Sequence, residues 1–521
     1  MCLGLSLGAF CVSRARPNGR ALCHLHPNLQ NDGTGPRKRE PRFRNAAFAF
    51  LHLRNVRLVG DQMVMCFVHS LRASQEVTLN RKAKIKAKRE SSATNSCIIS
   101  AGEIFADGAM IELVSGSSGL NKPELLLWNG RRMTAGPRVE HGGCIYQAPD
   151  LAPSLYRAMR LPSRSSGYGS ARSLFAAITD LFQHHLDLPD RESSLLASFS
   201  ISTWLADRLP TAPCLAISGP DQELGMDVLR LLGCVCRHSL MLAEITPGGF
   251  RSLPMELGLT LLLNQQEVRP NLQRLFRASS YPGLHLPGNG GRLVDLYGPK
   301  AIFCGNDAAL DTLRDGVIHI SVTPSQLQST VLSEPVQNEI ANSFQSRLLM
   351  YRLKNCGKLH ESQVDVSTFT FATRPLARTL ALCFPEDSGL ARDTVQLLRP
   401  QDDEVRGQRS RDVNCTIVEI LWAITHEGKQ REVQVDELAK DVNTLLKSRG
   451  ETLIYSPEQI GWKLKSLNIP RHSSSAGRQV LLERDTRHYV HRLARAYDLA
   501  CTQSKEAGCH DCNQAKAAIS K

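Results

Sequence analysis

The sequence predicts a multidomain α/β protein with a parallel β-sheet at its centre, and three observations lead to this expectation. Between residues 214 and 324, short apolar runs alternate with helical segments, which is the pattern of a parallel sheet covered on both faces. Before it, residues 108–130 hold two strand-like runs separated by a Gly/Ser turn. After it, residues 413–497 read as helix, strand, helix, helix, hairpin and closing helix.

The net charge of the chain is unevenly distributed. Residues 1–90 hold 17 Lys and Arg against 5 Asp and Glu, whereas the rest of the 521 residues hold 46 against 45. Basicity is therefore a property of the N-terminal segment and does not predict that the whole protein binds nucleic acid. Residues 1–95 read as a basic, disordered segment, as an arm that touches phosphates, or as a stretch that precedes the true start of the protein.

Composition restricts the compartment and the partners. No apolar run reaches the ~18 residues of a transmembrane helix, and the N-terminus lacks the charged region and cleavage site of a signal peptide. The 16 cysteines follow no framework, which indicates reduced thiols. We expect a cytoplasmic protein with no membrane partner.

We assign residues 96–165 to a small β module, with strands at 108–115 and 124–130. The HGGC stretch at 141–144 resembles half a metal site, but no second pair lies nearby, so a structural role is expected. Apolar residues at three- and four-residue spacing predict helices over 170–205.

The central α/β core is assigned to residues 166–345. Its predicted strands are 214–218, 240–246, 259–263, 300–306 and 316–324, and its predicted helices are 225–238 and 270–280. A further helix is possible after Pro247, a Gly-rich hairpin is expected around 283–297, and the CVC stretch at 234–236 is expected to pack in the core. Residues 346–409 are interpreted as a helical region and linker, with the charged stretch 399–412 as an exposed boundary.

The C-terminal unit is assigned to residues 410–500, followed by a tail at 501–521. One of its helices should begin at an N-capping Ser456 with Pro457 in the first turn, and another should end at Gly450. The order of elements is that of a winged helix-turn-helix.

The first core strand runs into SGPDQELGMDVLRLL, where a doubly wound fold binds ligands. A working phosphate loop reads G-x-x-x-x-G-K-[ST]. Counting from Pro220 gives the correct spacing to Gly225, whereas counting from Gly219 makes the loop one residue longer. Met226 then replaces the lysine that neutralises phosphate, and Asp227 replaces the hydroxyl that binds Mg²⁺ and would repel phosphates.

The third core strand, LTLLLNQQ, lies where P-loop proteins carry Asp and Glu to hold the metal and the attacking water. Asn264 and Gln265 occupy these positions. Asn can still offer an oxygen to Mg²⁺, but Gln cannot accept a proton at neutral pH. Two independent motifs are thus altered in the same direction.

Residues 214–324 resemble the helicase-like P-loop ATPases of phages and mobile elements, which include bacterial families of unknown function related to primase–helicase proteins. The resemblance rests on the two motifs above and on the stretches QRLFRASSYPG, VDLYGPKAIFCGND and LRDGVIHISVTP. The resemblance implies a RecA-like P-loop core in which Asn306 is the polar sensor residue.

The sequence thus predicts a catalytically degenerate helicase-like protein that binds DNA or a replication or mobile-element partner without hydrolysing ATP. No cofactor is expected, although weakened ATP and Mg²⁺ binding stays open. The alternatives are an active ATPase or helicase with an unorthodox nucleotide site and an oligomeric scaffold that binds itself or another protein.

DNA binding is expected in the winged-helix-like unit, through the second helix of its turn motif and through its wing. The residues expected to contact DNA are Lys463 and Lys465 of the helix and Arg471, His472 and Arg478 of the wing. Trp462 leaves open that this unit docks a protein instead. CHDC at 509–512, with Cys501 upstream and His488 and His491 one helix earlier, outlines a zinc corner, but its spacing is irregular and no metal ligand is assigned.

Overall fold

The computed structural model describes residues 97–116, 122–287, 293–305, 313, 316–323, 332–359, 364–427, 431–475, 477–499 and 509. The predicted basic segment at 1–95, Asn306 and most of the tail lie outside these residues. None of the described helices is both long enough and apolar enough to cross a membrane.

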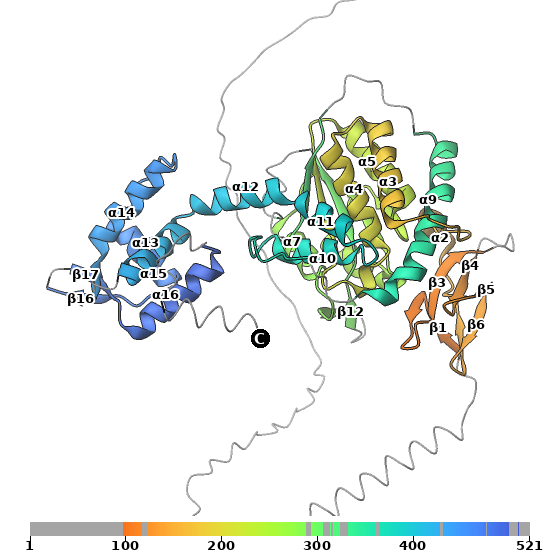
Figure 1. Cartoon of the computed structure of the whole chain (residues 1–521), viewed down its shortest axis with the longest axis horizontal. Coiled ribbons are helices and arrows are strands. Elements are labelled where there is room, and N and C mark those ends of the chain that lie inside the picture. Colours follow the sequence, from red (N-terminus) through yellow and green to blue (C-terminus); the bar gives the residue numbers. More distant parts are fainter. Residues whose placement is uncertain are drawn as a thin grey trace, which may run out of the picture. The chain divides into compact units, whose positions relative to one another are not determined.

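The N-terminal part of the described chain is a β module of two small sheets (Figure 1). One sheet has the order β2-β3-β4-β5 and the other β1-β7-β6. The strands are β1 (Cys97–Ile99), β2 (Gly102–Ile104), β3 (Met110–Ser115), β4 (Pro123–Trp128), β5 (Met133–Gly136), β6 (Arg138–His141) and β7 (Cys144–Gln147). The two predicted strands are confirmed as β3 and β4.

The HGGC stretch forms the turn between β6 and β7. Gly142 and Gly143 have φ angles of 57° and 75°, and His141 pairs with Cys144 across the hairpin. A two-residue hairpin turn of this kind needs positive φ at both central positions, which glycine tolerates. The expected structural role of this stretch is confirmed.

The core is a five-stranded parallel sheet with the order β14-β8-β13-β10-β9. In chain order the strands are β8 (Cys214–Ser218), β9 (Ser239–Leu242), β10 (Thr260–Asn264), β13 (Lys300–Cys304) and β14 (Ile318–Ser321), so the first strand lies between the fifth and the fourth. All five predicted strands are confirmed. Their apolar runs are continuous because helices cover both faces of the sheet.

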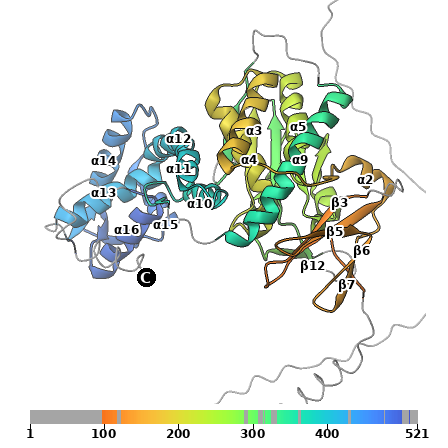
Figure 2. The same ribbon diagram turned by 45° about the vertical axis from the view of Figure 1, so that its right-hand side comes forward.

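Alternate residues of each core strand face different layers. Leu262 packs with α5 in one hydrophobic cluster, whereas Leu261 and Leu263 belong to the second. Figure 2 shows the first layer with α3, α4, α5 and α9. The helices of the core are α2 (Pro153–Ala158), α3 (Ala171–Leu186), α4 (Asp190–Thr203), α5 (Gln222–Val235), α6 (Pro247–Ser252), α7 (Pro270–Ala278) and α9 (Glu334–Asn355), and the predicted hairpin is β11 (His285–Pro287) with β12 (Leu293–Asp295).

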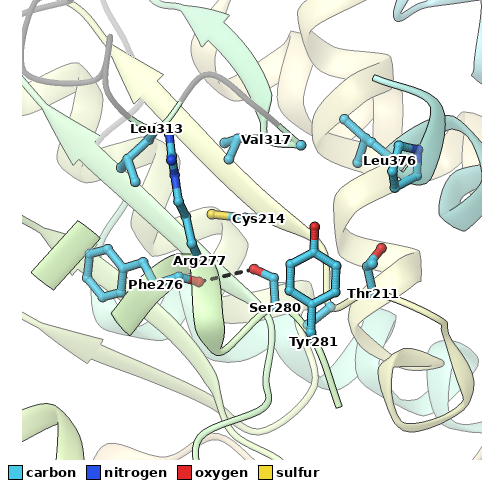
Figure 3. A pocket seen from close by; sticks show the side chains of 12 residues that line it. Thr211, Cys214, Phe276, Arg277, Ser280, Tyr281, Leu313, Val317 and Leu376 are labelled. Atoms are coloured by element: carbon cyan, nitrogen blue, oxygen red, sulfur yellow. Dashed lines mark hydrogen bonds between the residues drawn. The ribbon is translucent and has the colours of Figure 1, made fainter. Parts of the chain in front are cut away.

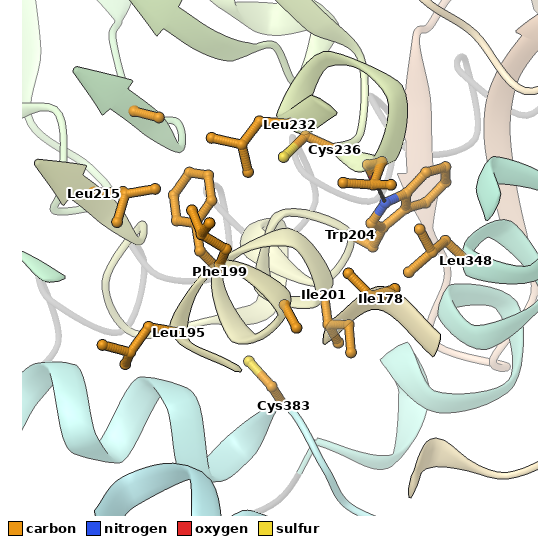
Figure 4. Packing of buried hydrophobic residues seen from close by; sticks show 14 of the residues in the cluster. Ile178, Leu195, Phe199, Ile201, Trp204, Leu215, Leu232, Cys236, Leu348 and Cys383 are labelled. Carbon is orange, nitrogen blue, oxygen red and sulfur yellow. Dashed lines mark hydrogen bonds between the residues drawn. The ribbon is translucent and has the colours of Figure 1, made fainter. Parts of the chain in front are cut away.

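The first layer is closely packed around α4 (Figure 4). Trp204 is fully buried there, and its indole Nε1 donates to the Val235 carbonyl over 2.8 Å. Cys234 and Cys236 are also fully buried, and burial raises the pKa of the Cys236 thiol to about 12. The interpretation of the CVC stretch as core packing is confirmed.

An ion cluster fastens the β module to the core. The fully buried Glu112 of β3 accepts from Arg237 Nε and Nη2 over 2.6 and 3.0 Å and from Arg352 Nε over 2.8 Å. Arg352 also donates to Asp207 Oδ1 over 2.8 Å. Burial alone would raise the pKa of Glu112, but the guanidinium groups of Arg237 and Arg352 hold it well below the ordinary value.

Three helices follow the core: α10 (Arg374–Leu382), α11 (Ser388–Gln396) and α12 (Arg399–Ser410). The prediction that 399–412 is an exposed boundary is wrong for one side of α12, where Gln401, Asp402 and Val405 are buried. Asp402 accepts from the Thr370 N–H over 3.0 Å and from its hydroxyl over 2.6 Å, and it pairs with Arg406 one turn later. The charges are thus tolerated inside because they are hydrogen-bonded.

The C-terminal unit has its own hydrophobic core and a three-stranded sheet of order β15-β17-β16. Its elements are α13 (Val413–Glu427), β15 (Glu432–Gln434), α14 (Val435–Ser448), α15 (Pro457–Ser466), β16 (His472–Ser474), β17 (Gly477–Leu481) and α16 (Arg484–Ala496). Ser456 caps α15, with Gln459 completing a reciprocal capping box. The predicted order of elements is confirmed.

Candidate nucleotide site and candidate nucleic-acid interface

The carboxyl edge of the parallel sheet brings together several residues that the sequence singles out. β8 ends at Ser218 and β10 at Asn264. Gly219 follows β8 and Gly305 follows β13. The two glycines lie side by side, because a Cβ atom placed on Gly305 would be 4.0 Å from the Gly219 carbonyl oxygen. Asn264 is half-buried and shares the strand face of Leu262, which packs with α5. Asn264 and Gly219 therefore belong to the same edge of the sheet.

The connection from β8 to α5 is only three residues long: Gly219, Pro220 and Asp221. A Cβ on Gly219 would lie 2.3 Å from the Val322 oxygen after β14, so the close approach of the two chain segments requires glycine. In a phosphate loop, the whole Gly-to-Lys pattern stands between strand and helix. Here only three residues stand between strand and helix.

Gly225, Met226 and Asp227 lie inside α5 and not in the preceding loop. A Cβ on Gly225 would clash at 2.2 Å with the Phe303 ring of β13, so this glycine serves helix–sheet packing. Met226 packs against the adjacent core cluster, and Asp227 pairs with Arg230 over 2.6 Å. Their spacing in the sequence imitates a phosphate loop, whereas in the structure all three are helical residues.

A carboxylate of the protein itself occupies the N-terminus of α5. Asp221 is the N-cap, and its Oδ1 accepts from the backbone N–H of Glu223 over 2.9 Å and of Leu224 over 3.1 Å. These are N–H groups that would otherwise face a bound phosphate. Glu223 adds a second acidic group to the first turn.

Gln265 is a structural residue and not part of the open edge. It is 5% exposed, its Oε1 accepts from the Ile245 N–H over 3.0 Å, and its Nε2 donates to the Glu267 oxygen over 2.9 Å. Both ends of the amide are therefore used to hold the segment after β9 against β10. The structure separates the role of Gln265 from that of Asn264, although the sequence motif pairs them.

A cavity of about 210 Å³ opens at the opposite, amino end of the sheet (Figure 3). Cys214, Phe276, Ser280 and Val317 are among its lining residues. Lys300, fully buried at the start of β13, donates to the Ser280 hydroxyl over 3.1 Å, and burial lowers the pKa of its amine. This cavity lies away from the carboxyl edge, where α/β sheets bind ligands.

A parallel sheet whose first strand lies between the fourth and the fifth, with a helix following that first strand, defines a RecA-like α/β core. No protein-family model and no curated protein sequence matches the chain.

Solved structures that are similar to this chain at a low level include the following three. The apo C-terminal region of NrS-1 is 11% identical, with 72% of this chain and 97% of that chain covered and a TM-score of 0.32. A full-length MCM homolog from Methanopyrus kandleri is 10% identical, with 56% and 76% covered and a TM-score of 0.25. Cdc6p from Pyrobaculum aerophilum is 11% identical, with 59% and 95% covered and a TM-score of 0.17. These scores are too low to bear on function.

The winged-helix-like unit brings two of its predicted DNA-binding residues, Arg471 and Arg478, together over α15. A Cβ on Gly461 of α15 would lie 2.9 Å from Arg471 Nη1 and 3.9 Å from Arg478 Nη1, so both wing arginines lie over this helix. The five predicted residues are all at least partly exposed, on α15 or the wing: Lys463, Lys465, Arg471, His472 and Arg478.

The same unit carries exposed apolar side chains, of which the sequence alone singles out only Trp462. This residue of α15 is 68% exposed, and Leu453 and Ile454, just before the helix, are 64% and 81% exposed. The run TLIY ahead of the capping serine was the signal that could have identified the last two. Large apolar groups exposed in this way suit contacts with a partner.

Proposed function

We propose that this chain is a RecA-like P-loop protein that has lost ATP hydrolysis and acts by binding DNA through its winged-helix-like unit, in a replication or mobile-element setting. The loss of ATP hydrolysis is inferred mainly from the N-terminus of α5. There Asp221, at the end of a three-residue connection, occupies the position where an anion would bind. To bind there, the phosphates of ATP would have to displace this carboxylate, and the negative charge of Glu223 would repel them.

The loss of hydrolysis is supported by the chemistry at β10. Phosphoryl transfer needs a cation over the phosphates, a metal and a group that positions water, and each is worth orders of magnitude in rate. Neither Asn264 nor Gln265 provides a negative charge, and the Gln265 amide is already engaged with Ile245 and Glu267.

Steady-state phosphate release from ATP with Mg²⁺ tests this half of the proposal. The expected result is a rate at background for the wild-type protein and for Asn264→Ala. Turnover above background that disappears in Asn264→Ala contradicts the proposal and favours an active ATPase with an unorthodox site.

DNA binding is supported by the basic residues gathered on α15 and the wing. Between residues 463 and 495 the sequence has eight Lys and Arg against two Asp and Glu. In a winged helix, the second helix of the turn motif enters the major groove and the wing touches the backbone. Because these side chains are mostly long and cationic, phosphate contacts should dominate and affinity should fall with salt.

The DNA test uses a chain that begins at residue 97, because residues 1–90 would add non-specific charge. Lys463→Ala, Lys465→Ala and Arg478→Ala together should lower affinity for double-stranded DNA by at least about tenfold. They should also flatten the dependence of log K on log salt by about 0.9 for each phosphate that the variant no longer neutralises. The matched control removes three exposed arginines outside this unit: Arg131, Arg251 and Arg274.

Unchanged DNA affinity in the triple variant, or an equal loss of affinity in the control, contradicts the DNA proposal. Trp462 then becomes the anchor to test for a protein partner, and light scattering tests the oligomeric scaffold.

A further inference from the structure

Three potential metal ligands from distant parts of the chain meet at the C-terminal unit. They are His426 in the last turn of α13, His491 in α16 and Cys509 after α16. One ligand atom of each lies within 4.8 Å of the others, and Cys509 Sγ lies 3.4 Å from His491 Nε2. Neither histidine ring is exposed, and His491 is buried.

Both imidazole rings are oriented by the backbone of their own helix. His426 Nδ1 donates to the Trp422 oxygen over 2.8 Å, and His491 Nδ1 donates to the Arg487 oxygen over 2.7 Å. A carbonyl can only accept, so Nδ1 carries hydrogen in each ring and Nε2 is the basic nitrogen. Histidines that bind metals are held in this way, with the second nitrogen donating to a carbonyl or carboxylate.

The ligand types select the metal. Imidazole nitrogen and thiolate sulfur suit Zn²⁺, whereas Ca²⁺ and Mg²⁺ take oxygen ligands. In a tetrahedral zinc site, bonds of about 2.05 Å to nitrogen and about 2.3 Å to sulfur separate the two ligand atoms by about 3.5 Å. The 3.4 Å between Cys509 Sγ and His491 Nε2 is close to this separation.

We propose that His426, His491 and Cys509 ligate a structural Zn²⁺ that fastens the segment after α16 to the α13–α16 helix pair. The Cys509 thiol loses its proton on binding and the imidazoles bind as neutral groups. The competing interpretation is a plain thiol–imidazole hydrogen bond, which needs no metal.

Metal analysis of the full chain tests this proposal. The protein is purified without chelator, incubated with zinc sulfate, dialysed, and measured by mass spectrometry for metal content. We expect one zinc per chain in the wild type and clearly less than half of that in His426→Ala, His491→Ala and Cys509→Ser.

Two variants serve as controls. His488→Ala changes a histidine one turn before His491 in α16, and Cys97→Ser removes an exposed cysteine of the β module. Both should retain one zinc. In the Co²⁺-loaded protein, thiolate-to-cobalt absorption should be present in the wild type and in His488→Ala, and absent in Cys509→Ser.

Cys509→Ser also separates metal loss from misfolding, because Cys509 lies after α16 and outside every described helix and strand. Its circular dichroism should match the wild type, and a chelator should lower Tm in the wild type but not in this variant. Absence of zinc in the reconstituted wild type, or wild-type zinc in both Cys509→Ser and His491→Ala, overturns the proposal.

Discussion

Glu112 is the residue on which the junction between the β module and the core depends most. It is fully buried, and its carboxylate pairs with the guanidinium groups of Arg237 and Arg352. We expect Glu112→Gln to destabilise the protein by about 3–5 kcal/mol, because the variant removes the counter-charge of the buried Arg237 and leaves Arg352 with Asp207 alone. Urea unfolding measures this difference, and the exposed Glu103→Gln on the neighbouring strand should change stability by less than about 0.5 kcal/mol.

The same residue predicts a pH dependence. The folded-state pKa of Glu112 is below its ordinary value of 4.5, so its ionisation contributes stability in full above that value. This contribution is lost as pH falls below 4.5 and through the lower folded-state pKa. The wild-type advantage over Glu112→Gln should therefore shrink with acidification, and an advantage that grows below pH 4.5 would contradict the assignment.

Gln265 is a second residue whose role the structure defines. In Gln265→Glu, the residue that a catalytic P-loop protein would carry, a carboxylate oxygen would face the Glu267 carbonyl that now accepts from Nε2. We expect a loss of about 1–3 kcal/mol in unfolding free energy and no gain of ATPase activity. Gln266→Glu, at the exposed neighbouring position, is the control and should be nearly neutral.

Helix α5 decides whether substitutions that restore the charges of a phosphate loop can create nucleotide binding. Met226→Lys, Asp227→Ser and Asn264→Asp together restore the charges of a working site, with Gln265 left in place. We expect no gain in Mg-ATP affinity by calorimetry, because residues 226 and 227 lie within α5, beyond its first turn. Tight Mg-ATP binding by this variant would show that the connection after β8 can rearrange into a phosphate loop.

At the level of elements, apolar periodicity predicted the sheet strands and the main helices, and the Ser-Pro pair predicted the N-cap at Ser456, because these features depend on local sequence. The roles of Gly225 and Gln265 were not predictable, since their partners Phe303 and Ile245 are set by strand pairing far along the chain. The prediction that residues 399–412 are exposed was wrong because Asp402 is buried against Thr370, a contact that the local sequence does not reveal. His426 was missed because only the packing of α13 against α16 brings it to His491.

For the whole molecule, the two hydrophobic clusters of the core are not confined to the α/β segment. Met110 and Val114 of β3 belong to one cluster, and Ile111 and Leu113 belong to the other. Alternate side chains of a single strand in the β module thus reach both layers. The β module and the α/β segment should unfold in a single cooperative transition, with coincident curves by fluorescence and circular dichroism.

The ion cluster at Glu112 has a practical consequence for expression of fragments. A chain that begins at residue 97 keeps every member of the cluster, whereas one that begins at residue 166 leaves Arg237 and Arg352 inside an apolar interior without Glu112. We expect the shorter fragment to accumulate in inclusion bodies and the longer one to remain in the supernatant. The safe place to shorten this protein is therefore ahead of the β module, and a deletion that follows the limits of the α/β segment cuts through its hydrophobic interior.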